Sequence, residues 1–350
     1  MKTKIFALIL ALACVLSLAA CGNKPTPSPE PADPGKSDAV DPLTITFNIA
    51  VSGEMYDKMS NTFAQRCSEL SNGAIQVQII AGGTMGSARE VVESMQLNTV
   101  NMIWAADSEL DQVVGNMSWA WLPYTVINYD MADKYYNEGW IDEALAEICE
   151  GAGIKLVAGS ENGFRVCCTK GKEINSADDL VGLKMRVPEQ DPLVRFYSLL
   201  GCLPSTITAS ESFAAMQQGT VDGSDNTLFN LNNLGFFDIA DTFVELNYQY
   251  SSAKIAANLD WFNALSEKQQ EIITTAAKEA SLEFRNGIRS QESSIIDAIT
   301  AKGVKVVVPD EAFQAAIKQK AASVMWEEAY QDYDAQYHKY IDKMIETFGN

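Results

Sequence analysis

Strands and helices alternate along this chain, and that alternation limits the fold more than any other feature of the sequence. Apolar residues at every second position predict strands at residues 44–51, 74–80 and 100–106. Apolar residues spaced three and four apart predict a helix at residues 54–70 and another between Ser87 and Asn98. This βαβαβ order is typical of parallel sheets covered by helices, whose ligands bind beyond the carboxyl ends of the strands.

The same alternation continues to the end of the chain. Two helices should begin with a capping box, Ser87 with Glu90 and Thr208 with Glu211, and Gly219 suits a left-handed helix end. The remaining predicted elements are helices at 131–150, 192–200 and 208–219, strands at 154–158, 164–169, 183–187 and 304–308, a strand-like stretch at 244–259, and mainly helix from 266 onward. About 308 residues follow the N-terminal region, which suits two α/β lobes around a cleft.

The N-terminus has the pattern of a lipoprotein signal. Lys2 and Lys4 precede an apolar run that is too short to span a membrane, so residues 1–20 are predicted to be a signal peptide. The sequence LAACG at 18–22 matches a lipobox, in which Cys21 becomes the acylated N-terminus, whereas Cys14 fits the pattern less well. Residues 21–42 hold six of the eleven prolines and are predicted to be an extended linker.

Charge and cysteine content exclude several functions. The net charge of −20 argues against nucleic acid or an anionic membrane surface as partner. The cysteines after Cys21 form no CxxC pair or Cys/His cluster, so no zinc site or other cofactor is expected, although a calcium ion bound together with the ligand at 222–225 is left open. We predict buried free thiols rather than a disulfide at Cys67, Cys149, Cys167, Cys168 and Cys202, with Cys167 and Cys168 on opposite faces of a strand.

Arg186 is the strongest single indication of a binding site. It lies in a short, otherwise apolar strand that is stopped by Pro188. A buried arginine is costly without a partner, so Arg186 is expected to face a cleft that receives an anion. A planar guanidinium fork fits the two oxygens of a carboxylate and stays charged at any working pH. The residues therefore indicate a receptor for small acids.

Four motifs, in this order and at these separations, resemble one known family. They are GGTMGSARE at 82–90, WLPY at 121–124, GLKMRVP at 182–188 and the segment 211–226 that ends in VDGSDN. The chain resembles the DctP-type solute-binding proteins of tripartite ATP-independent periplasmic (TRAP) transporters, from about residue 43 to the helix after residue 266. The resemblance implies a two-lobed, hinged, type II periplasmic-binding-protein fold with crossing segments and a long bridging helix. We place lobe I at 43–162 plus 252–291, and lobe II at 163–251 plus 292–350.

The resemblance also implies a set of ligand-binding residues. Arg186 matches the family arginine that takes the ligand carboxylate, Arg165 matches a second arginine near it, and Asn226 matches an asparagine that donates to the same group. The chain departs from the family where Gln-Glu-Asn-Pro becomes SDNT at 224–227, where Ala209 replaces a frequent aromatic residue, and where Ala106 replaces a glutamate of acid-sugar binders. Loss of an aromatic wall at Ala209 suggests a bulkier ligand or different packing, and a sialic-acid ligand is less expected than a simpler acid.

Other residues have competing interpretations. Glu54 and Asp107 follow predicted strands, where each could accept a hydrogen bond from a ligand hydroxyl or simply cap a helix. Core packing is favoured over a cleft role for the aromatic side chains at 104, 119, 121 and 124, and hinge packing for those at 248 and 250. His338, the single histidine, lies far from any serine motif, which argues against a hydrolase.

The predicted function is extracytoplasmic capture of a small organic acid and delivery to a TRAP permease. The protein is expected to be a non-enzymatic monomer, held at the outer face of the cytoplasmic membrane only by lipid on Cys21. One alternative is an amino-acid-binding lipoprotein of an ATP-driven (ABC) transporter, which would need Glu54 or Asp107 to meet the ligand ammonium. A less favoured alternative is an extracellular glycosidase with paired carboxylates. A sensor that presents its ligand to a membrane receptor is also left open.

Overall fold

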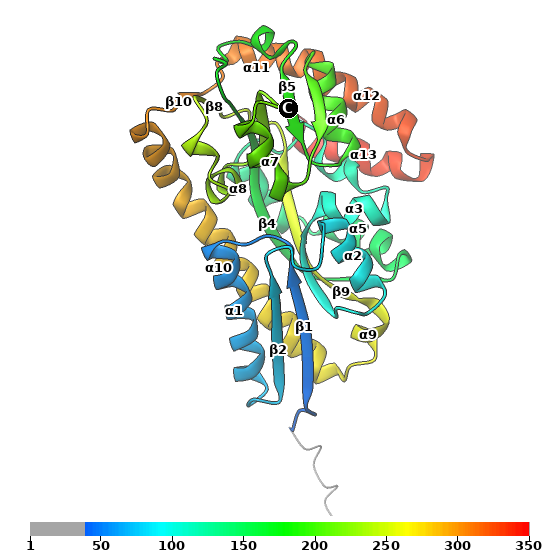
Figure 1. The fold of residues 1–350 in the computed structure, drawn as a ribbon. Helices are drawn as coiled ribbons and strands as arrows, with labels where there is room; N and C mark the ends of the chain where they lie inside the picture. The colour runs from blue at the N-terminus through cyan, green and yellow to red at the C-terminus, as the bar shows by residue number, and fades with distance from the viewer. Residues whose placement is uncertain (1–38, 350) are drawn as a thin grey trace, which may run out of the picture. The chain divides into compact units, whose positions relative to one another are not determined.

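The computed structural model describes residues 39–349. The predicted signal peptide at 1–20, the predicted lipidation site Cys21 and most of the proline-rich linker lie outside the described residues. From Val40 onward the chain forms one compact unit (Figure 1). Within residues 39–349, no helix combines the length and the apolar character that a membrane span requires.

A mixed sheet forms the centre of this unit. Its strand order is β2-β1-β3-β9-β4-β7-β5-β6, with β8 paired to β4 and β10 paired to β8. The strands are β1 Leu43–Ile49, β2 Ile75–Ala81, β3 Met102–Ala106, β4 Ile154–Thr169, β5 Lys184–Val187, β6 Leu203–Thr206, β7 Gly223–Thr227, β8 Thr242–Val244, β9 Tyr250–Asn258 and β10 Lys305–Val307.

The parallel pairing expected from the strand–helix alternation is present on both sides of the sheet and not in its middle. Strand β1 is parallel to β2 and β3, and β5 is parallel to β6 and β7. The central strands β9 and β4, however, run antiparallel to each other, β9 is antiparallel to β3, and β4 is antiparallel to β7. Local alternation could not reveal this reversal, because the pairing of β4 with β9 joins segments far apart in sequence.

Strand β4 is longer than the sequence pattern predicted. Two strands were expected, at 154–158 and 164–169, but hydrogen bonding to β9 continues between them, with irregularities at Leu156/Ala158 and Glu161/Gly163. The stretch predicted at 244–259 is instead divided, because β8 ends at Val244 and β9 begins at Tyr250. The long β4 therefore pairs with β9 along its first part and with β7 along its second part.

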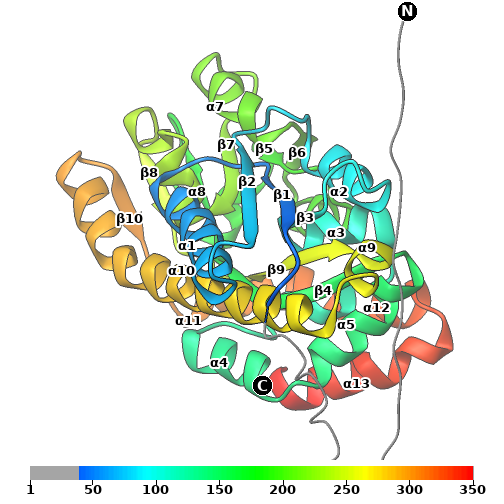
Figure 2. The same ribbon diagram turned by 90° about the horizontal axis from the view of Figure 1, so that it is seen from below.

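Helices cover the sheet. Their bounds are α1 Glu54–Leu70, α2 Ala88–Gln96, α3 Asp107–Val114, α4 Tyr129–Asn137, α5 Trp140–Gly151, α6 Asp191–Leu199, α7 Ala209–Gln217, α8 Leu228–Asn233, α9 Leu259–Asn263, α10 Glu267–Ala301, α11 Glu311–Ile317, α12 Ser323–Asp332 and α13 Ala335–Phe348. The long α10 contacts α1, β4, α8 and β10, and Figure 2 shows α1 and α10 side by side. This agrees with the long helix that the family resemblance implied.

Local sequence signals succeeded at α1 and α2 and partly failed elsewhere. Helix α1 has the predicted bounds, and its Phe63 ring lies 5.0 Å from that of Phe47 in β1. The capping box of Ser87 and Glu90 is present at α2. Thr208 does precede α7, but its hydroxyl donates to the Glu211 carboxylate at 2.8 Å and caps no backbone N–H, so that predicted capping box was wrong.

Glycine positions explain two further helix boundaries. The helix predicted at 131–150 is divided into α4 and α5 at Gly139, whose φ of 75° is unfavourable for residues with a Cβ. Gly219, after the end of α7, has the expected left-handed conformation, with φ of 76°. Glycine at a positive φ therefore ends the helix in both cases.

The cysteine prediction was confirmed for the described residues. All cysteines between residues 39 and 349 are buried and free: Cys67, Cys149, Cys167, Cys168 and Cys202. Cys167 and Cys168 pack into different apolar clusters, which fits their alternation on β4. Desolvation raises the pKa of Cys202 to about 12, so this thiol stays protonated at neutral pH.

Candidate functional site

Arg186 is buried in the middle of β5 and has no carboxylate partner. Arg186 is only 1% exposed. Its Nε donates to the main-chain carbonyl of Ile207 at 2.8 Å, and Nη1 donates to that of Asp225 at 3.0 Å. Among residues 39–349, no Asp or Glu forms a salt bridge with it and Nη2 has no hydrogen-bond partner. One face of the guanidinium fork is therefore held by the protein, while Nη2 is left to bind another group.

The charge of Arg186 persists at neutral pH. Burial, followed by the nearby positive charge of Arg165, lowers the pKa of Arg186 to about 10, and Asp225 acts in the opposite direction. A pKa of about 10 is far enough above 7 to keep the guanidinium protonated. The site therefore holds a buried positive charge that main-chain dipoles stabilise only in part.

Arg165 is already paired with a carboxylate. It lies on β4 and is 4% exposed, and its Nε and Nη2 both donate to Oδ1 of Asp225, the Nε bond measuring 2.8 Å. The other oxygen, Oδ2, accepts hydrogen bonds from the hydroxyls of Tyr197 at 2.9 Å and Tyr248 at 3.0 Å. Both oxygens of the Asp225 carboxylate therefore accept hydrogen bonds, and its negative charge forms a salt bridge with Arg165. The ligand contact predicted for Arg165 stays a prediction.

Asn226 is the next residue on β7 and takes part in a cluster of amide side chains. Its Oδ1 accepts from the backbone N–H of Thr227 at 2.9 Å and from Asn230 Nδ2 at 3.3 Å. Asn230 Nδ2 donates to Asn162 Oδ1 at 3.2 Å, and the Tyr56 hydroxyl lies 2.9 Å from the Oδ1 atoms of both asparagines, which share its one proton. The Nδ2 group of Asn226 donates to no described residue. This orientation leaves Asn226 with a free donor, which its predicted ligand role requires.

The structure also adds Glu109, which the sequence analysis missed. Glu109 lies in the first turn of α3, where its Oε2 accepts the backbone N–H of Ala106 at 3.0 Å. Burial raises the pKa of Glu109 to about 6, while that hydrogen bond and the positive charge of Arg165 oppose the rise. Glu109 is therefore electrostatically close to Arg165. An acidic residue three positions after a strand end was the signal that could have identified it.

Three other predicted site residues have different surroundings. Asp107 begins α3 but caps nothing, because its buried carboxylate lies 3.3 Å from Lys254 Nζ and accepts the Ser252 hydroxyl at 2.5 Å. Glu54 begins α1 and is exposed, without a side-chain cap. Ala209 begins α7 and is half-buried. Their predicted ligand contacts stay predictions.

The aromatic residues behave mainly as expected. Trp104 is buried against Tyr56 and Phe284, with ring centroids 5.1 and 5.9 Å away. Tyr248 packs near the crossing strands, as predicted, with its ring stacked 3.9 Å from that of Phe196. Its bond to Asp225 is an additional role that the sequence did not indicate. Tyr248 thus helps to fix the carboxylate that holds Arg165.

Comparison with known proteins identifies the family. Residues 48–332 match the DctP model, described as bacterial extracellular solute-binding protein, family 7. A solute-binding protein of Verminephrobacter eiseniae is 26% identical over 265 residues, covering 75% of this chain and 79% of the relative. The C4-dicarboxylate-binding periplasmic protein DctP of Rhodobacter capsulatus is 25% identical over 255 residues, covering 72% and 76%.

A solved structure supports the same fold. The sugar acid binding protein DctPAm of Advenella mimigardefordensis, in complex with galactonate, has a TM-score of 0.79 at 22% identity, covering 88% of this chain and 99% of that one. The fold is therefore that of a two-lobed periplasmic binding protein. The chain belongs to the DctP family of extracytoplasmic solute-binding proteins of TRAP transporters. Members of this family are receptors and not enzymes, which sets aside the glycosidase and ABC-type alternatives.

Proposed function

We propose that this protein captures a small organic acid through Arg186 and delivers it to a TRAP permease. The observation that carries the proposal is the state of the Arg186 guanidinium, which is buried, charged and bound only by main-chain carbonyls. A ligand carboxylate would supply the counter-charge that the described residues do not provide. The Nδ2 group of Asn226 and the guanidinium of Arg165 would complete the carboxylate clamp.

The energetics are adequate for a receptor. Micromolar binding needs about 8 kcal/mol. Hydrogen bonds to charged groups contribute roughly 1.5–3 kcal/mol each, so two or three bonds to the carboxylate would supply a large part of it. Ligand contacts made only in the closed form would then favour closure of the two lobes.

Glu109 would favour acids that also carry a hydroxyl group. Its Oε1 accepts no hydrogen bond from a described residue, and its carboxylate is close enough to Arg165 to feel that charge. A carboxylate accepts hydrogen bonds and donates none when ionised, so it suits a ligand hydroxyl. Among similar solved proteins, one was obtained with galactonate and another with D-erythronate bound. We therefore favour a small hydroxy acid over a simple fatty acid.

The location and the lobe boundaries belong to the same proposal. The mature protein would be a monomer tethered by lipid on Cys21 to the outer face of the cytoplasmic membrane. Lobe I would comprise residues 43–162 and 252–291, and lobe II residues 163–251 and 292–350. The strand β4 supports this division, because it pairs with β9 along its first part and with β7 along its second part.

A thermal-shift screen with Arg186→Ala tests the function. Hydroxy acids should raise the melting temperature of the unmodified protein, and Arg186→Ala should weaken binding by about 100-fold, since it removes the charge-assisted bonds. Arg89→Ala is the matched control, because Arg89 is an exposed arginine on α2 that pairs with Glu93. Circular dichroism checks that each variant is folded. Equal ligand shifts in Arg186→Ala and Arg89→Ala would contradict the proposal.

A further inference from the structure

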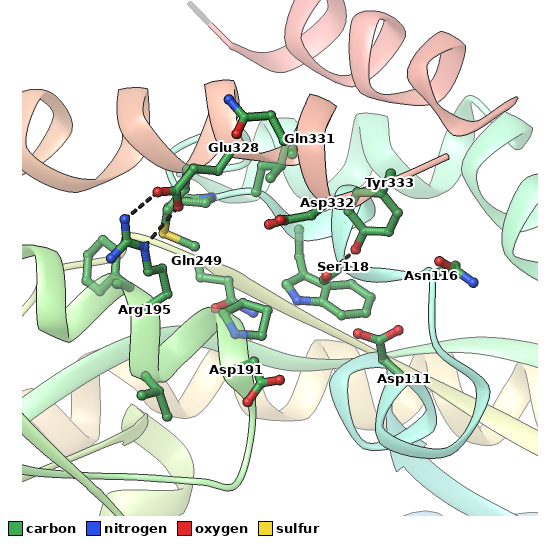
Figure 3. A pocket seen from close by; sticks show the side chains of 18 of the residues that line it. Asp111, Asn116, Ser118, Asp191, Arg195, Gln249, Glu328, Gln331, Asp332 and Tyr333 are labelled. Atoms are coloured by element: carbon green, nitrogen blue, oxygen red, sulfur yellow. Dashed lines mark hydrogen bonds and ion pairs between the residues drawn. The ribbon is translucent and has the colours of Figure 1, made fainter. Parts of the chain in front are cut away.

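A cavity of about 820 Å³ lies beside the crossing strands, between α3, α6 and α12 (Figure 3). Arg186, Arg165 and Asn226 are not among the residues that line it. Its size falls within the range of small-molecule sites. The cavity adjoins the clamp at Tyr248, which bonds to Asp225, but the three proposed acid-binding side chains do not line it.

Carboxylates dominate the charge of this cavity. Asp111 of α3, Asp191 of α6, and Glu328 and Asp332 of α12 line it (Figure 3). Among the described lining residues, Arg195 is the one basic side chain, and it pairs with Glu328 through a bond of 2.9 Å from Nε. The other three carboxylates have no salt-bridge partner within residues 39–349. Arg195 therefore neutralises part of the charge on α12, where Asp332 also feels it, while Asp111 and Asp191 present negative charge from α3 and α6 without a salt-bridge partner in residues 39–349.

The carboxylates also affect one another. Burial is the largest cause that raises the pKa of Asp111 to about 6, and the negative charges of Asp107 and Asp191 add to the rise. The backbone N–H of Met117 opposes it by donating to Asp111 Oδ1 at 2.8 Å. A cation in the cavity would relieve this repulsion.

The neutral part of the lining suits an organic ligand. Gln249 is 5% exposed and lines the cavity, and its side-chain amide forms no hydrogen bond with any described residue. The amide is also absent from the fully buried side-chain groups that lack a partner, so it reaches the space of the cavity and is available to a bound molecule. The aromatic rings of Trp121, Phe196 and Tyr333 also line the cavity. Aromatic faces together with carboxylates form a favourable environment for ammonium groups.

A metal ion fits this cavity less well than an organic cation. In the described part of the chain, no three His, Cys, Asp or Glu side chains are arranged to hold a metal ion. The acids of the cavity come from separate helices and are spread over a large space. A molecule of several atoms could contact them together with Gln249 and the aromatic rings.

We propose that this cavity is a second ligand site, which binds a small organic cation that carries an ammonium group. Asp111 and Asp191 would hold the ammonium, the aromatic rings would pack against its alkyl part, and Gln249 would hydrogen-bond to it. This inference goes beyond the proposed function, because the cation binds without the Arg186 clamp and without the acid ligand.

Calorimetry and thermal shift on the purified protein at pH 8 test this site. The probes are 1,4-diaminobutane and choline, compared with the neutral 1,4-butanediol and with NaCl at equal ionic strength. The diamine and the quaternary ammonium ion should each bind saturably and raise the melting temperature, and the diol and NaCl should not. Amine effects no larger than those of NaCl would overturn the proposal.

Variants locate the binding. Asp111→Asn and Asp191→Asn should each weaken amine binding by about tenfold, as expected for loss of one charge-assisted contact. Asp297→Asn is the matched control. Asp297 is exposed on α10, so this substitution removes the same charge outside the cavity. Arg186→Ala should bind amines as tightly as the unmodified protein, even if the acid-binding proposal fails. Equal losses in Asp297→Asn and Asp111→Asn, or loss of amine binding in Arg186→Ala, would contradict the second site.

Discussion

Asp225 distinguishes the two buried arginines, because its carboxylate pairs with Arg165 and forms no salt bridge with Arg186 in the described residues. The Asp225 carboxylate accepts hydrogen bonds from Arg165, Tyr197 and Tyr248. Arg186 donates to the main-chain carbonyl of Asp225 instead. A carboxylate that already accepts hydrogen bonds on both oxygens has little capacity to neutralise a second cation. The difference between the two arginines therefore comes from the geometry around one aspartate.

Replacement of Arg186 by lysine tests whether the shape of the guanidinium matters in addition to its charge. Arg186→Lys should weaken acid binding by about 100-fold, because a single ammonium cannot reproduce the bonds to Ile207 and Asp225 while also binding two carboxylate oxygens. Calorimetry measures the affinity. Arg89→Lys, on the exposed surface of α2, should bind normally. An Arg186→Lys affinity close to that of the unmodified protein would show that charge alone is sufficient.

Asp111 should make stability depend on pH. Its pKa is raised to about 6 in the folded protein, above its value in the unfolded chain, so ionised Asp111 destabilises the fold above about pH 6. Asp111→Asn keeps an oxygen for the Met117 N–H and removes the charge. The variant should be more stable by about 1–3 kcal/mol at pH 8, and the difference should vanish below about pH 4.

Urea denaturation at pH 4, 6 and 8 measures this difference in the free energy of unfolding. Asp297→Asn again removes one exposed charge and should show little pH-dependent gain. A destabilised Asp111→Asn variant at pH 8 would mean that the ionised carboxylate forms a favourable contact in the cavity.

At the scale of secondary structure, β7 shows how tertiary context can override local pattern. Its sequence, GSDNT, has no apolar alternation, and no strand was predicted there from the sequence. All of its residues are nevertheless buried, because β7 lies between β4 and β5. The strand pairs Ser224 with Arg186 and brings the Asp225 carbonyl within hydrogen-bond distance of the guanidinium, and Asn226 is the next residue of the same strand.

Gly223, the first residue of β7, should not tolerate a side chain. A Cβ there would lie 2.7 Å from the carbonyl oxygen of Cys168 and 2.7 Å from Met185 Sδ. The main chain of β4 cannot move away easily, so Gly223→Ala should destabilise the fold by about 1–3 kcal/mol. Urea denaturation measures the change.

Gly151→Ala provides the matched comparison. Gly151 ends α5, and a Cβ there would meet nothing within 4 Å. This substitution should be neutral or stabilise by up to about 1 kcal/mol, because alanine has a smaller entropic cost than glycine in a helix. Equal stabilities of Gly223→Ala and Gly151→Ala would show that β7 has room for a side chain.

At the scale of the whole molecule, function depends on where the receptor is held. The family is extracytoplasmic, and delivery to a membrane permease benefits from a receptor that stays near the membrane. The net charge of −20 does not favour adsorption to an anionic surface, so a covalent lipid would be needed for retention. The lipobox around Cys21 is the predicted means of attachment.

Fractionation of expressing cells tests the anchor. The unmodified protein should sediment with membranes, and Cys21→Ser should be released, because the acylated thiol is lost. Cys14→Ser is the control and should stay with the membranes. Retention of Cys21→Ser would exclude lipidation at this position.

The sequence alone determined the fold class and the identity of the main candidate residues. The elements β1, α1 and β2 could be predicted because the spacing of apolar residues within each segment indicates both its type and its buried face. The motif around Arg186 and the cysteine spacing were also readable without coordinates. These predictions concern a residue and its near neighbours in the chain.

Only the tertiary structure decided how the charges are paired. Asp225 with Arg165, Asp107 with Lys254, and the cavity acids of α3, α6 and α12 join segments from distant parts of the chain. The antiparallel pairing of β4 and β9 brings such segments together, and no local period encodes it. Which arginine is neutralised and which stays available is therefore a property of packing, because a side chain's partner depends on three-dimensional distance and not on sequence separation.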